Sequence, residues 1–181
     1  SEMEMRAAEI VADEAGDITI SLSHEIGRVG LLERENATIM NACLTDLASL
    51  VVESFRGALR KLDIRAPFYI SQNDGTLMSA EHVEKYPVLT FASGPTNSMR
   101  GAAFLAKAQE AMVVDIGGTT SDVGMLLHGF PRESSVAVDF GGVRTNFRMP
   151  DVFSFGLGGG SLVRDDGARI GPDSVGYELT T

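Results

Sequence analysis

The segment Asp115–Asp122 combines the residue types that bind a phosphate group together with a divalent cation. Within eight residues it holds two aspartates, two glycines and two threonines, and apolar runs flank it on both sides. Glycines let a phosphate approach main-chain N–H groups closely, and threonine hydroxyls donate to phosphate oxygens. Carboxylates suit Mg²⁺, which binds oxygen ligands and gives up its waters reluctantly. The segment therefore predicts a turn that binds an anion and a metal.

Each residue of this turn has an expected role. The cofactor-binding residues are Gly117, Gly118, Thr119 and Thr120. Asp115 is expected to hold Mg²⁺ through water, because a carboxylate repels a phosphate that it would touch directly. Asp122 is expected to serve the same metal or to orient a nucleophile, so both aspartates are candidate catalytic residues. The alternative is a hairpin whose two aspartates only accept hydrogen bonds from turn amides.

The local pattern excludes the two commonest glycine-rich phosphate loops. A Walker loop needs Gly-Lys-Ser/Thr before a helix, and a dinucleotide loop needs G-x-G-x-x-G at the start of a helix. Here the apolar run 111–116 precedes the turn and the apolar run 123–127 follows it. Strand, tight turn and strand predict a β-hairpin.

Two further segments carry candidate binding residues. Gly158, Gly159, Gly160 and Ser161 could bring a second set of amide donors to the cofactor, or could form a demanding turn between strands. Arg144, Asn146 and Arg148 are candidate substrate-side residues, since arginine forks suit phosphate and carboxylate groups. Ion pairing on the surface of an acidic protein is the alternative for the two arginines.

The elements that must position these residues follow from hydrophobic periodicity and turn signals. Apolar residues recur every three or four positions from 31 to 62 and predict a long helix, whose apolar stripe should face the core. Cys43 lies in that stripe and is expected to be a buried, inert thiol. The other expected elements are helices at 2–15, 79–86 and 97–107, strands at 18–22, 68–70, 88–91, 111–116, 123–127 and 136–140, and a hairpin turn at 165–167.

The composition of the chain indicates which partners it can bind and in which cell compartment it is expected. The formal net charge of −10 argues against nucleic acid and membrane surfaces, which are anionic and need a basic patch. The single cysteine excludes an internal disulfide. No uncharged apolar run approaches the ~20 residues of a membrane span, and no signal peptide is visible. These features predict a cytoplasmic protein.

The turn resembles a phosphate motif of the actin-like ATPase superfamily, and the chain as a whole resembles the hydantoinase/5-oxoprolinase family within it. The stretches that carry the resemblance are Ser21–Gly27, Leu32–Ala37, Asn73–Thr76, Thr90–Pro95, Asp115–Gly124, Gly142–Asp151 and Gly158–Ser161. They cover nearly the whole chain in the family's order. The resemblance implies an α/β fold, a ribonuclease-H-like mixed sheet with flanking helices, to which the long N-terminal helix is added.

The same resemblance implies a function. It points to an ATP- and Mg²⁺-dependent hydrolase that opens a five-membered cyclic amide, such as hydantoin, N-methylhydantoin or 5-oxoproline, by phosphorylating its carbonyl oxygen. The alternative within enzymes is a subunit of an ATP-dependent ketone carboxylase of the acetone or acetophenone type. An alternative of another class is a non-catalytic actin-like module whose nucleotide state gates assembly.

The resemblance also implies that the chain is incomplete. Such ATPases carry two phosphate motifs and a glycine-rich segment that grips the adenosine, and this sequence has one phosphate motif. We therefore expect residues 1–181 to be a single partial domain, helical over 1–66 and α/β over 67–181. Alone it should be inactive, with the remaining lobe or a partner subunit needed for turnover.

Overall fold

A computed structural model describes residues 1–134 and 137–180, which fall into two units. Unit 1 comprises Ser1–Phe91 and Ser134–Met149, and unit 2 comprises Ala92–Glu133 and Pro150–Thr181. Helices and small sheets alternate along the chain, so the predicted mixed α/β fold with a long N-terminal helix is confirmed. The predicted division of the chain at residue 66 stays a prediction.

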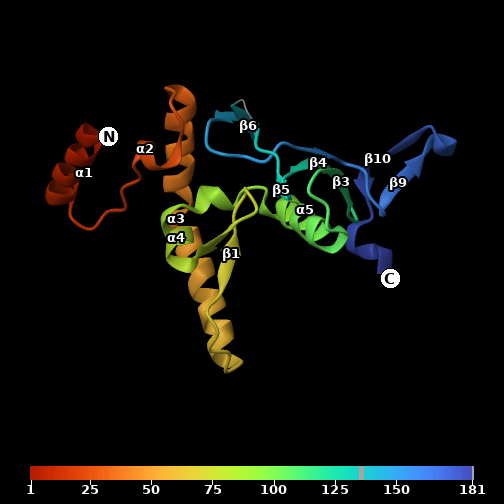
Figure 1. Ribbon diagram of the computed structural model, residues 1–181, viewed down its shortest axis with the longest axis horizontal. Helices are drawn as coiled ribbons and strands as arrows, with labels where there is room; N and C mark the ends of the chain where they lie inside the picture. Colours follow the sequence, from red (N-terminus) through yellow and green to blue (C-terminus); the bar gives the residue numbers. More distant parts are fainter. Residues whose placement is uncertain (135–136, 181) are drawn as a thin grey trace. The chain divides into compact units, whose positions relative to one another are not determined.

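Unit 1 begins with three helices, α1 (Glu2–Ala15), α2 (Ser23–Ile26) and α3 (Leu32–Lys61) (Figure 1). The Ser1 side chain caps α1 by accepting a hydrogen bond from the Glu4 amide. In turn, the Glu4 carboxylate accepts a hydrogen bond from the main-chain nitrogen of Ser1. The strand expected at 18–22 is wrong, because within residues 1–134 and 137–180 no strand pairs with this segment. Ser21 instead accepts a hydrogen bond from the Asn41 side chain at 3.2 Å.

The buried side of α3 is not the apolar stripe that periodicity predicted. Ile39, Leu47, Phe55 and Leu62 are each more than half exposed, and Cys43 is exposed, so the expectation of a buried thiol is wrong. The buried residues are Ala37, Asn41, Thr45, Ala48 and Val52. They are mostly small, and small side chains let neighbouring segments approach the helix closely.

A hairpin and two short helices cover that small-residue side of α3. These elements are β1 (Tyr69–Ser71), β2 (Leu77–Ser79), α4 (Ala80–Lys85) and the 3₁₀ helix η1 (Pro87–Thr90). Ala48 and Val52 pack with Met78 and Val83 in one core cluster. The short helix expected at 79–86 is confirmed as α4, and the Ser79 hydroxyl caps it by accepting a hydrogen bond from the His82 amide at 3.3 Å.

The strand expected at 88–91 is wrong, because η1 occupies this segment. Proline at its first position fixes φ near the helical value. The amide of Val88 donates to the buried side-chain oxygen of Asn41 at 3.4 Å, and Asn41 also donates to the Lys85 carbonyl at 2.9 Å. One polar side chain of α3 therefore holds the turn between α4 and η1.

A second hairpin, β6 (Val138–Phe140) with β7 (Val143–Thr145), completes unit 1. The ring of Phe140 stacks on Phe91 with centroids 4.4 Å apart. Asn36 of α3 donates to the Arg144 carbonyl at 2.9 Å. The hairpin confirms a strand near the predicted position, although Val136 lies outside the described residues.

Unit 2 is a small antiparallel sheet with one helix on it. Its elements are α5 (Ser93–Ala106), β3 (Ala111–Ile116), β4 (Ser121–Leu127), β5 (Phe130–Pro131) and β8 (Val152–Phe155) (Figure 1). β4 pairs with β3 on one side and with β5 and β8 on the other. Met99 and Ala103 of α5 pack on Leu126 and Val113. The helix starts at Ser93, earlier than the predicted 97, because Ala92 turns the chain in the left-handed region.

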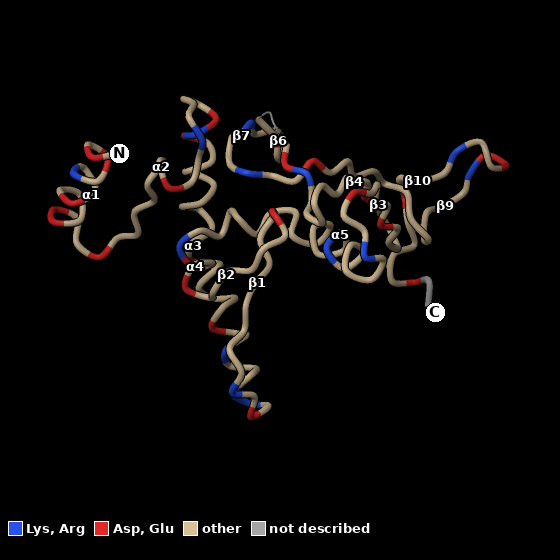
Figure 2. Tube along the Cα trace, viewed as in Figure 1, with Lys and Arg blue, Asp and Glu red and all other residues tan. Residues whose placement is uncertain are grey.

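The last hairpin of unit 2 pairs β9 (Ser161–Arg164) with β10 (Arg169–Ser174), and the 3₁₀ helix η3 (Gly176–Thr180) follows it. The predicted turn at 165–167 is confirmed as a short 3₁₀ turn, η2 (Asp165–Gly167). Figure 2 shows charges of both signs at this tip. Arg164 pairs with Asp173 at 3.0 Å, so the hairpin tip is not a basic patch.

Two glycine segments of unit 2 contact each other through the main chain. The amide of Gly159 donates to the Gly117 carbonyl at 2.9 Å, and that of Gly160 donates to the Gly118 carbonyl at 2.7 Å. The Ser121 hydroxyl donates to the Leu157 carbonyl at 2.5 Å. The segment before β9 therefore holds the turn between β3 and β4 from one side.

Helix α3 is long and apolar enough to cross a membrane by length and composition alone. This is weak evidence, because core helices of water-soluble proteins pass the same test. Here Val52 and Ala48 of α3 contribute to the core of unit 1. The helix therefore packs into the core of that unit through these two residues.

The attachment of α1 gives a prediction about pH. Glu4 accepts hydrogen bonds from the Ser23 amide at 2.5 Å and from His24 Nδ1 at 2.6 Å, and Arg34 lies 3.4 Å away. Desolvation acts to raise the pKa of Glu4, but the bonds from Ser23 and His24 outweigh it and lower that pKa from 4.5 to about 2. The stabilising contribution is thus present above pH 4.5 and is lost as pH falls toward 2.

We expect Glu4→Gln to speed hydrogen exchange of the Ser23 amide about tenfold at pH 7, because a charge-assisted bond is replaced by a neutral one. Near pH 2 the wild type and the variant should exchange alike. Glu9→Gln is the control, because the Glu9 carboxylate accepts a hydrogen bond from Arg6 on the same helix and is far from Ser23 in the sequence. Equal protection of Ser23 in wild type and Glu4→Gln at pH 7 would contradict this account.

The glycine contact gives a second prediction. A Cβ at Gly158 would lie 2.6 Å from the Gly117 carbonyl oxygen and 2.7 Å from the Gly118 carbonyl carbon, whereas a Cβ at Gly159 would have its nearest neighbour at 3.9 Å. Gly158→Ala should lower the free energy of unfolding by about 1–3 kcal/mol, because main-chain atoms must move. Gly159→Ala should cost less than about 1 kcal/mol. Urea denaturation of both variants measures this difference, and equal losses would be inconsistent with the contact.

Candidate functional site

The turn between β3 and β4 lies at the exposed end of the hairpin. The two strands pair antiparallel from Ala111 opposite Leu126 to Ile116 opposite Ser121, which confirms the predicted hairpin. The Gly117 amide then donates to the Thr120 carbonyl at 2.9 Å and closes the turn. All four residues from Gly117 to Thr120 are exposed. An anion can therefore reach the turn from solvent.

Three main-chain donors of this turn are left for a ligand. Among the hydrogen bonds of the described residues, none has the amide of Gly118, Thr119 or Thr120 as its donor. Exposed N–H groups that follow one another along the chain are suited to binding an anion. Neither Gly117 nor Gly118 has a positive φ, so these positions do not need glycine for a left-handed conformation. A Cβ at Gly118 would meet nothing within 4 Å, and one at Gly117 would lie 3.3 Å from the Thr120 carbonyl oxygen. The small size that this contact requires is therefore that of Gly158, which packs against their main chain.

Two carboxylates face each other just below the turn. Asp115 of β3 is the direct cross-strand partner of Asp122 of β4, and both side chains are half-buried. Residues that are directly opposite in an antiparallel pair lie on the same face with Cβ atoms about 4.5–5.5 Å apart, and like charges there are destabilising. Ser154 is the next residue in this row, and its hydroxyl donates to Asp122.

The charge of this pair has no cationic partner among the side chains that the structure describes. No lysine or arginine in residues 1–134 or 137–180 forms an ion pair with Asp115 or Asp122. In the same residues no three histidine, cysteine, aspartate or glutamate side chains converge as a metal site. The chain thus offers a cation two carboxylates, which suits a magnesium ion that keeps waters and binds phosphate oxygens.

The amides of the second glycine segment are already engaged. Gly158 donates to the Ser161 hydroxyl oxygen at 2.8 Å, and Gly159 and Gly160 donate to carbonyls of the turn. These three N–H groups are therefore not available to a phosphate in this conformation. The contribution of the segment to a cofactor site is to hold Gly117 and Gly118 in place, with the Ser161 hydroxyl as its remaining donor.

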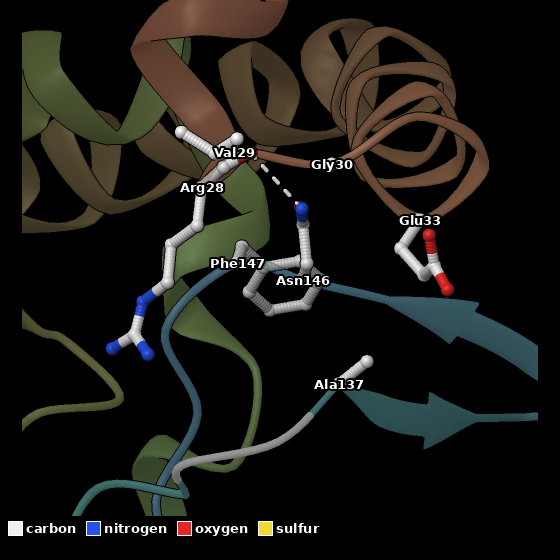
Figure 3. A pocket seen from close by; sticks show the side chains of 7 residues that line it. All are labelled: Arg28, Val29, Gly30, Glu33, Ala137, Asn146 and Phe147. Carbon is white, nitrogen blue, oxygen red and sulfur yellow. Dashed lines mark hydrogen bonds between the residues drawn. The ribbon is translucent and has the colours of Figure 1, made fainter.

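The three candidate substrate-side residues belong to unit 1 and have different surroundings. Asn146 lines a cavity of about 270 Å³, shown in Figure 3 together with Arg28 and Glu33. Arg144 does not line it, but its Nε lies 3.5 Å from Glu33 Oε1. Arg148 is exposed, and its carbonyl accepts a hydrogen bond from Asn73 at 2.5 Å.

Sequence reasoning assigned no role to Ser154, Arg28 or Glu33. The signal for Ser154 is a polar residue between Phe153 and Phe155 in a short apolar strand. For Arg28 and Glu33 the signal is weaker. Both lie within or beside stretches that resemble the hydantoinase/5-oxoprolinase family, but no motif indicates a binding role for either side chain. Only the fold brings residues 28–33 next to residue 146.

Known proteins resemble this chain over nearly its whole length. The acetophenone carboxylase gamma subunit of Aromatoleum aromaticum is 26% identical over 186 residues, covering 96% of this chain and 25% of that protein. The structure of an ATP-dependent caprolactamase from Pseudomonas jessenii is 25% identical with a TM-score of 0.77, covering 97% of this chain and 26% of that one. The nucleotide-free acetone carboxylase structure, at 24% identity and a TM-score of 0.68 over 98% of this chain and 26% of that chain, supports the fold.

This chain spans about a quarter of the length of each of these proteins. The profile of the Hydantoinase/oxoprolinase family matches residues 34–181, which include both glycine segments and the facing aspartates. The match covers well over half of the chain. The chain therefore belongs to the Hydantoinase/oxoprolinase family.

Proposed function

We propose that the turn Gly117–Thr120 binds the terminal phosphates of ATP in an enzyme that uses ATP to open a cyclic amide. The observation that carries this proposal is the juxtaposition of three exposed, uncommitted amides with two facing carboxylates. Phosphate needs the donors, and its magnesium needs the carboxylates. The names of the caprolactamase and the acetone carboxylase both specify ATP dependence, which supports ATP as the nucleotide.

Different residues of the hairpin bind the phosphates and the metal. The amides of Gly118, Thr119 and Thr120 and the two threonine hydroxyls donate to phosphate oxygens. Asp115 holds the metal through water, and Asp122 serves the same metal or orients the nucleophile, with Ser154 fixing its carboxylate. The metal, when bound, neutralises the charge that develops on the phosphates during transfer.

The chemistry begins with an amide that resists water because of its resonance. The lactam oxygen attacks the γ-phosphorus, the bond to the β-phosphate oxygen breaks, and ADP leaves. Water then adds to the activated carbon, the C–N bond breaks with a proton going to nitrogen, and a second water hydrolyses the acyl phosphate to carboxylate and phosphate. The contribution of the turn is positioning and charge stabilisation.

The alternative is an ATP-dependent ketone carboxylase subunit. The similarity to the acetophenone carboxylase gamma subunit favours it, since that relative aligns over almost the whole chain. The turn would play the same part, because an oxygen nucleophile again takes a phosphoryl group from ATP. What differs is the acceptor, so the facing aspartates do not discriminate between the two reactions.

In either reaction this chain supplies part of the enzyme. The relatives are about four times as long, and we propose that a further lobe or a partner subunit contributes the second phosphate motif and the adenosine contacts. Hydantoin, N-methylhydantoin and 5-oxoproline are the proposed five-membered substrates. A cytoplasmic location, together with the inactivity of residues 1–181 alone, belongs to the same proposal.

Removal of one facing carboxylate tests the metal assignment. Without divalent cations, Asp115→Asn should raise Tm by about 1–3 °C, because a cross-strand like-charge pair of about 0.2–1 kcal/mol disappears. Millimolar Mg²⁺ should raise Tm of the wild type but not of Asp115→Asn. Asp46→Asn, at an exposed position of α3, should behave like the wild type in both measurements. An identical response to Mg²⁺ in all three proteins would refute the assignment.

Turnover tests the reaction. In the longer enzyme, ADP release should be stimulated by hydantoin or 5-oxoproline, and Asp115→Ala should reduce the stimulated rate at least about a hundredfold. Stimulation by ketone plus bicarbonate instead would select the carboxylase. An Asp115→Ala enzyme that retains full activity with either substrate would exclude a catalytic role for this aspartate.

A further inference from the structure

The hydrogen bonds to the carbonyls in the turn between β3 and β4 decide the direction of its N–H groups. The C=O of one residue and the N–H of the next share one planar trans peptide unit, in which the two groups point in opposite directions. The Gly117 carbonyl accepts a hydrogen bond from the Gly159 amide at 2.9 Å. The Gly118 carbonyl accepts one from the Gly160 amide at 2.7 Å. These bonds therefore direct the N–H groups of Gly118 and Thr119 away from the two donors.

The three uncommitted amides of the turn are not equivalent. Those of Gly118 and Thr119 belong to peptide units whose carbonyls are hydrogen-bonded. The amide of Thr120 shares its peptide unit with the Thr119 carbonyl, which accepts no hydrogen bond from the residues that the structure describes. A hydrogen bond to the carbonyl also polarises the peptide unit, which strengthens its N–H as a donor. Two amides are thus both oriented and strengthened, and the third is neither.

The glycine segment that supplies these bonds is itself held by two serine hydroxyls. The Ser121 hydroxyl donates to the Leu157 carbonyl at 2.5 Å. At the other end of the same peptide unit, the Gly158 amide donates to the Ser161 hydroxyl oxygen at 2.8 Å. Both polar groups of this peptide unit are thus bonded to side chains. Its orientation determines where the next two amides along the chain lie, and these are the donors to the turn.

Ser121 supports the turn from a position that a ligand does not reach. It is the first residue of β4, opposite Ile116 of β3 and Phe155 of β8, and it is only 3% exposed. Successive side chains of a strand point to opposite faces of the sheet, so its hydroxyl and the Asp122 carboxylate lie on different faces. Ser121 therefore affects a ligand only through the main chain that it holds.

We propose that Ser121 is a positioning residue for the phosphate, and that the amides of Gly118 and Thr119 are the principal phosphate donors. The Ser121 hydroxyl fixes the Leu157 carbonyl, and the glycine segment then bonds the carbonyls of the turn. Those bonds direct the two amides toward the ligand, whereas the amide of Thr120 is not directed in this way and contributes less. This role rests on the proposed binding of phosphate at the turn, and it adds which donors bind the phosphate and what orients them.

Amide resonances of the wild-type chain test the ranking of the three donors. The probe is magnesium pyrophosphate, and its binding is followed in ¹⁵N–¹H correlation spectra of residues 1–181. The amides of Gly118 and Thr119 should each shift at least about twice as far as that of Thr120, because oriented and polarised donors form the stronger hydrogen bonds. Equal shifts at all three amides, or the largest shift at Thr120, would overturn the ranking.

Removal of the hydroxyl tests the role of Ser121. Ser121→Ala should weaken the binding of magnesium pyrophosphate about tenfold, since two donors lose their orientation. Ser121→Thr keeps the hydroxyl and should bind within about threefold of the wild type. Thr96→Val is the control, because it removes a fully buried hydroxyl of α5 that donates to the Ala92 carbonyl, and it should leave the affinity unchanged.

Hydrogen exchange without ligand distinguishes the possible outcomes. The Gly160 amide should exchange at least about tenfold faster in Ser121→Ala than in the wild type, and Ser121→Thr should restore its protection. Wild-type affinity or wild-type exchange in Ser121→Ala would overturn the positioning role and leave the phosphate turn in place, and so would equal losses of affinity in Ser121→Ala and Thr96→Val. No saturable shift of any turn amide in the wild type up to about 20 mM would instead refute phosphate binding at the turn, and with it this role of Ser121.

Discussion

The pairing of β3 with β4 places two carboxylates of like charge opposite each other, and the rest of the candidate site depends on this placement. Asp115 and Asp122 are fixed by six consecutive cross-strand pairs, so neither can leave the other without loss of strand pairing. Their repulsion persists in the folded chain because no lysine or arginine of the described residues pairs with them. A sheet that tolerates such a pair at an exposed end is suited to a cation.

The apolar part of the same sheet explains why the pair lies where it does. Val113 of β3 and Leu126 of β4 share their face with the two aspartates, and α5 covers that face through Met99 and Ala103. Gly124 lies under Met99, where a Cβ would be 2.7 Å from its sulfur. The helix anchors the sheet at one end, and the carboxylates and the turn occupy the other. The residues that pack against α5 and the residues of the candidate site thus lie at opposite ends of the β3–β4 pair.

The hairpin between residues 111 and 127 could be predicted from the sequence because the information is local. Two apolar runs around a glycine-rich turn specify which residues oppose each other. The helix bounds of α3 were equally local, but its buried side was not. Periodicity located an apolar stripe through Ile39, Leu47 and Phe55, whereas the elements that follow pack on the side of Ala48 and Val52. Which side of a helix is covered depends on chain segments that are distant in sequence.

The two wrongly predicted strands have the same cause, which is contact with segments that are distant in the sequence. Alternating apolar residues at 18–22 and the apolar run at 88–91 had strand-like composition, but a strand requires a neighbour, and the described chain pairs neither segment. For 88–91 the deciding contact comes from Asn41, almost fifty residues earlier. The uncommitted amides of the turn were predicted from its glycines, but the engagement of the Gly158–Gly160 amides was not. That engagement depends on how two glycine segments meet in space.

The meeting of those two segments has a consequence for how a ligand would be received. A free glycine-rich loop samples many conformations, and a ligand that must order it loses affinity to conformational entropy. Here the carbonyls of Gly117 and Gly118 accept hydrogen bonds from Gly159 and Gly160, while the amides of Gly118, Thr119 and Thr120 donate to no acceptor among the described residues. The turn therefore loses its conformational entropy when the chain folds, and not when a ligand binds. Its N–H donors are already ordered before any phosphate binds.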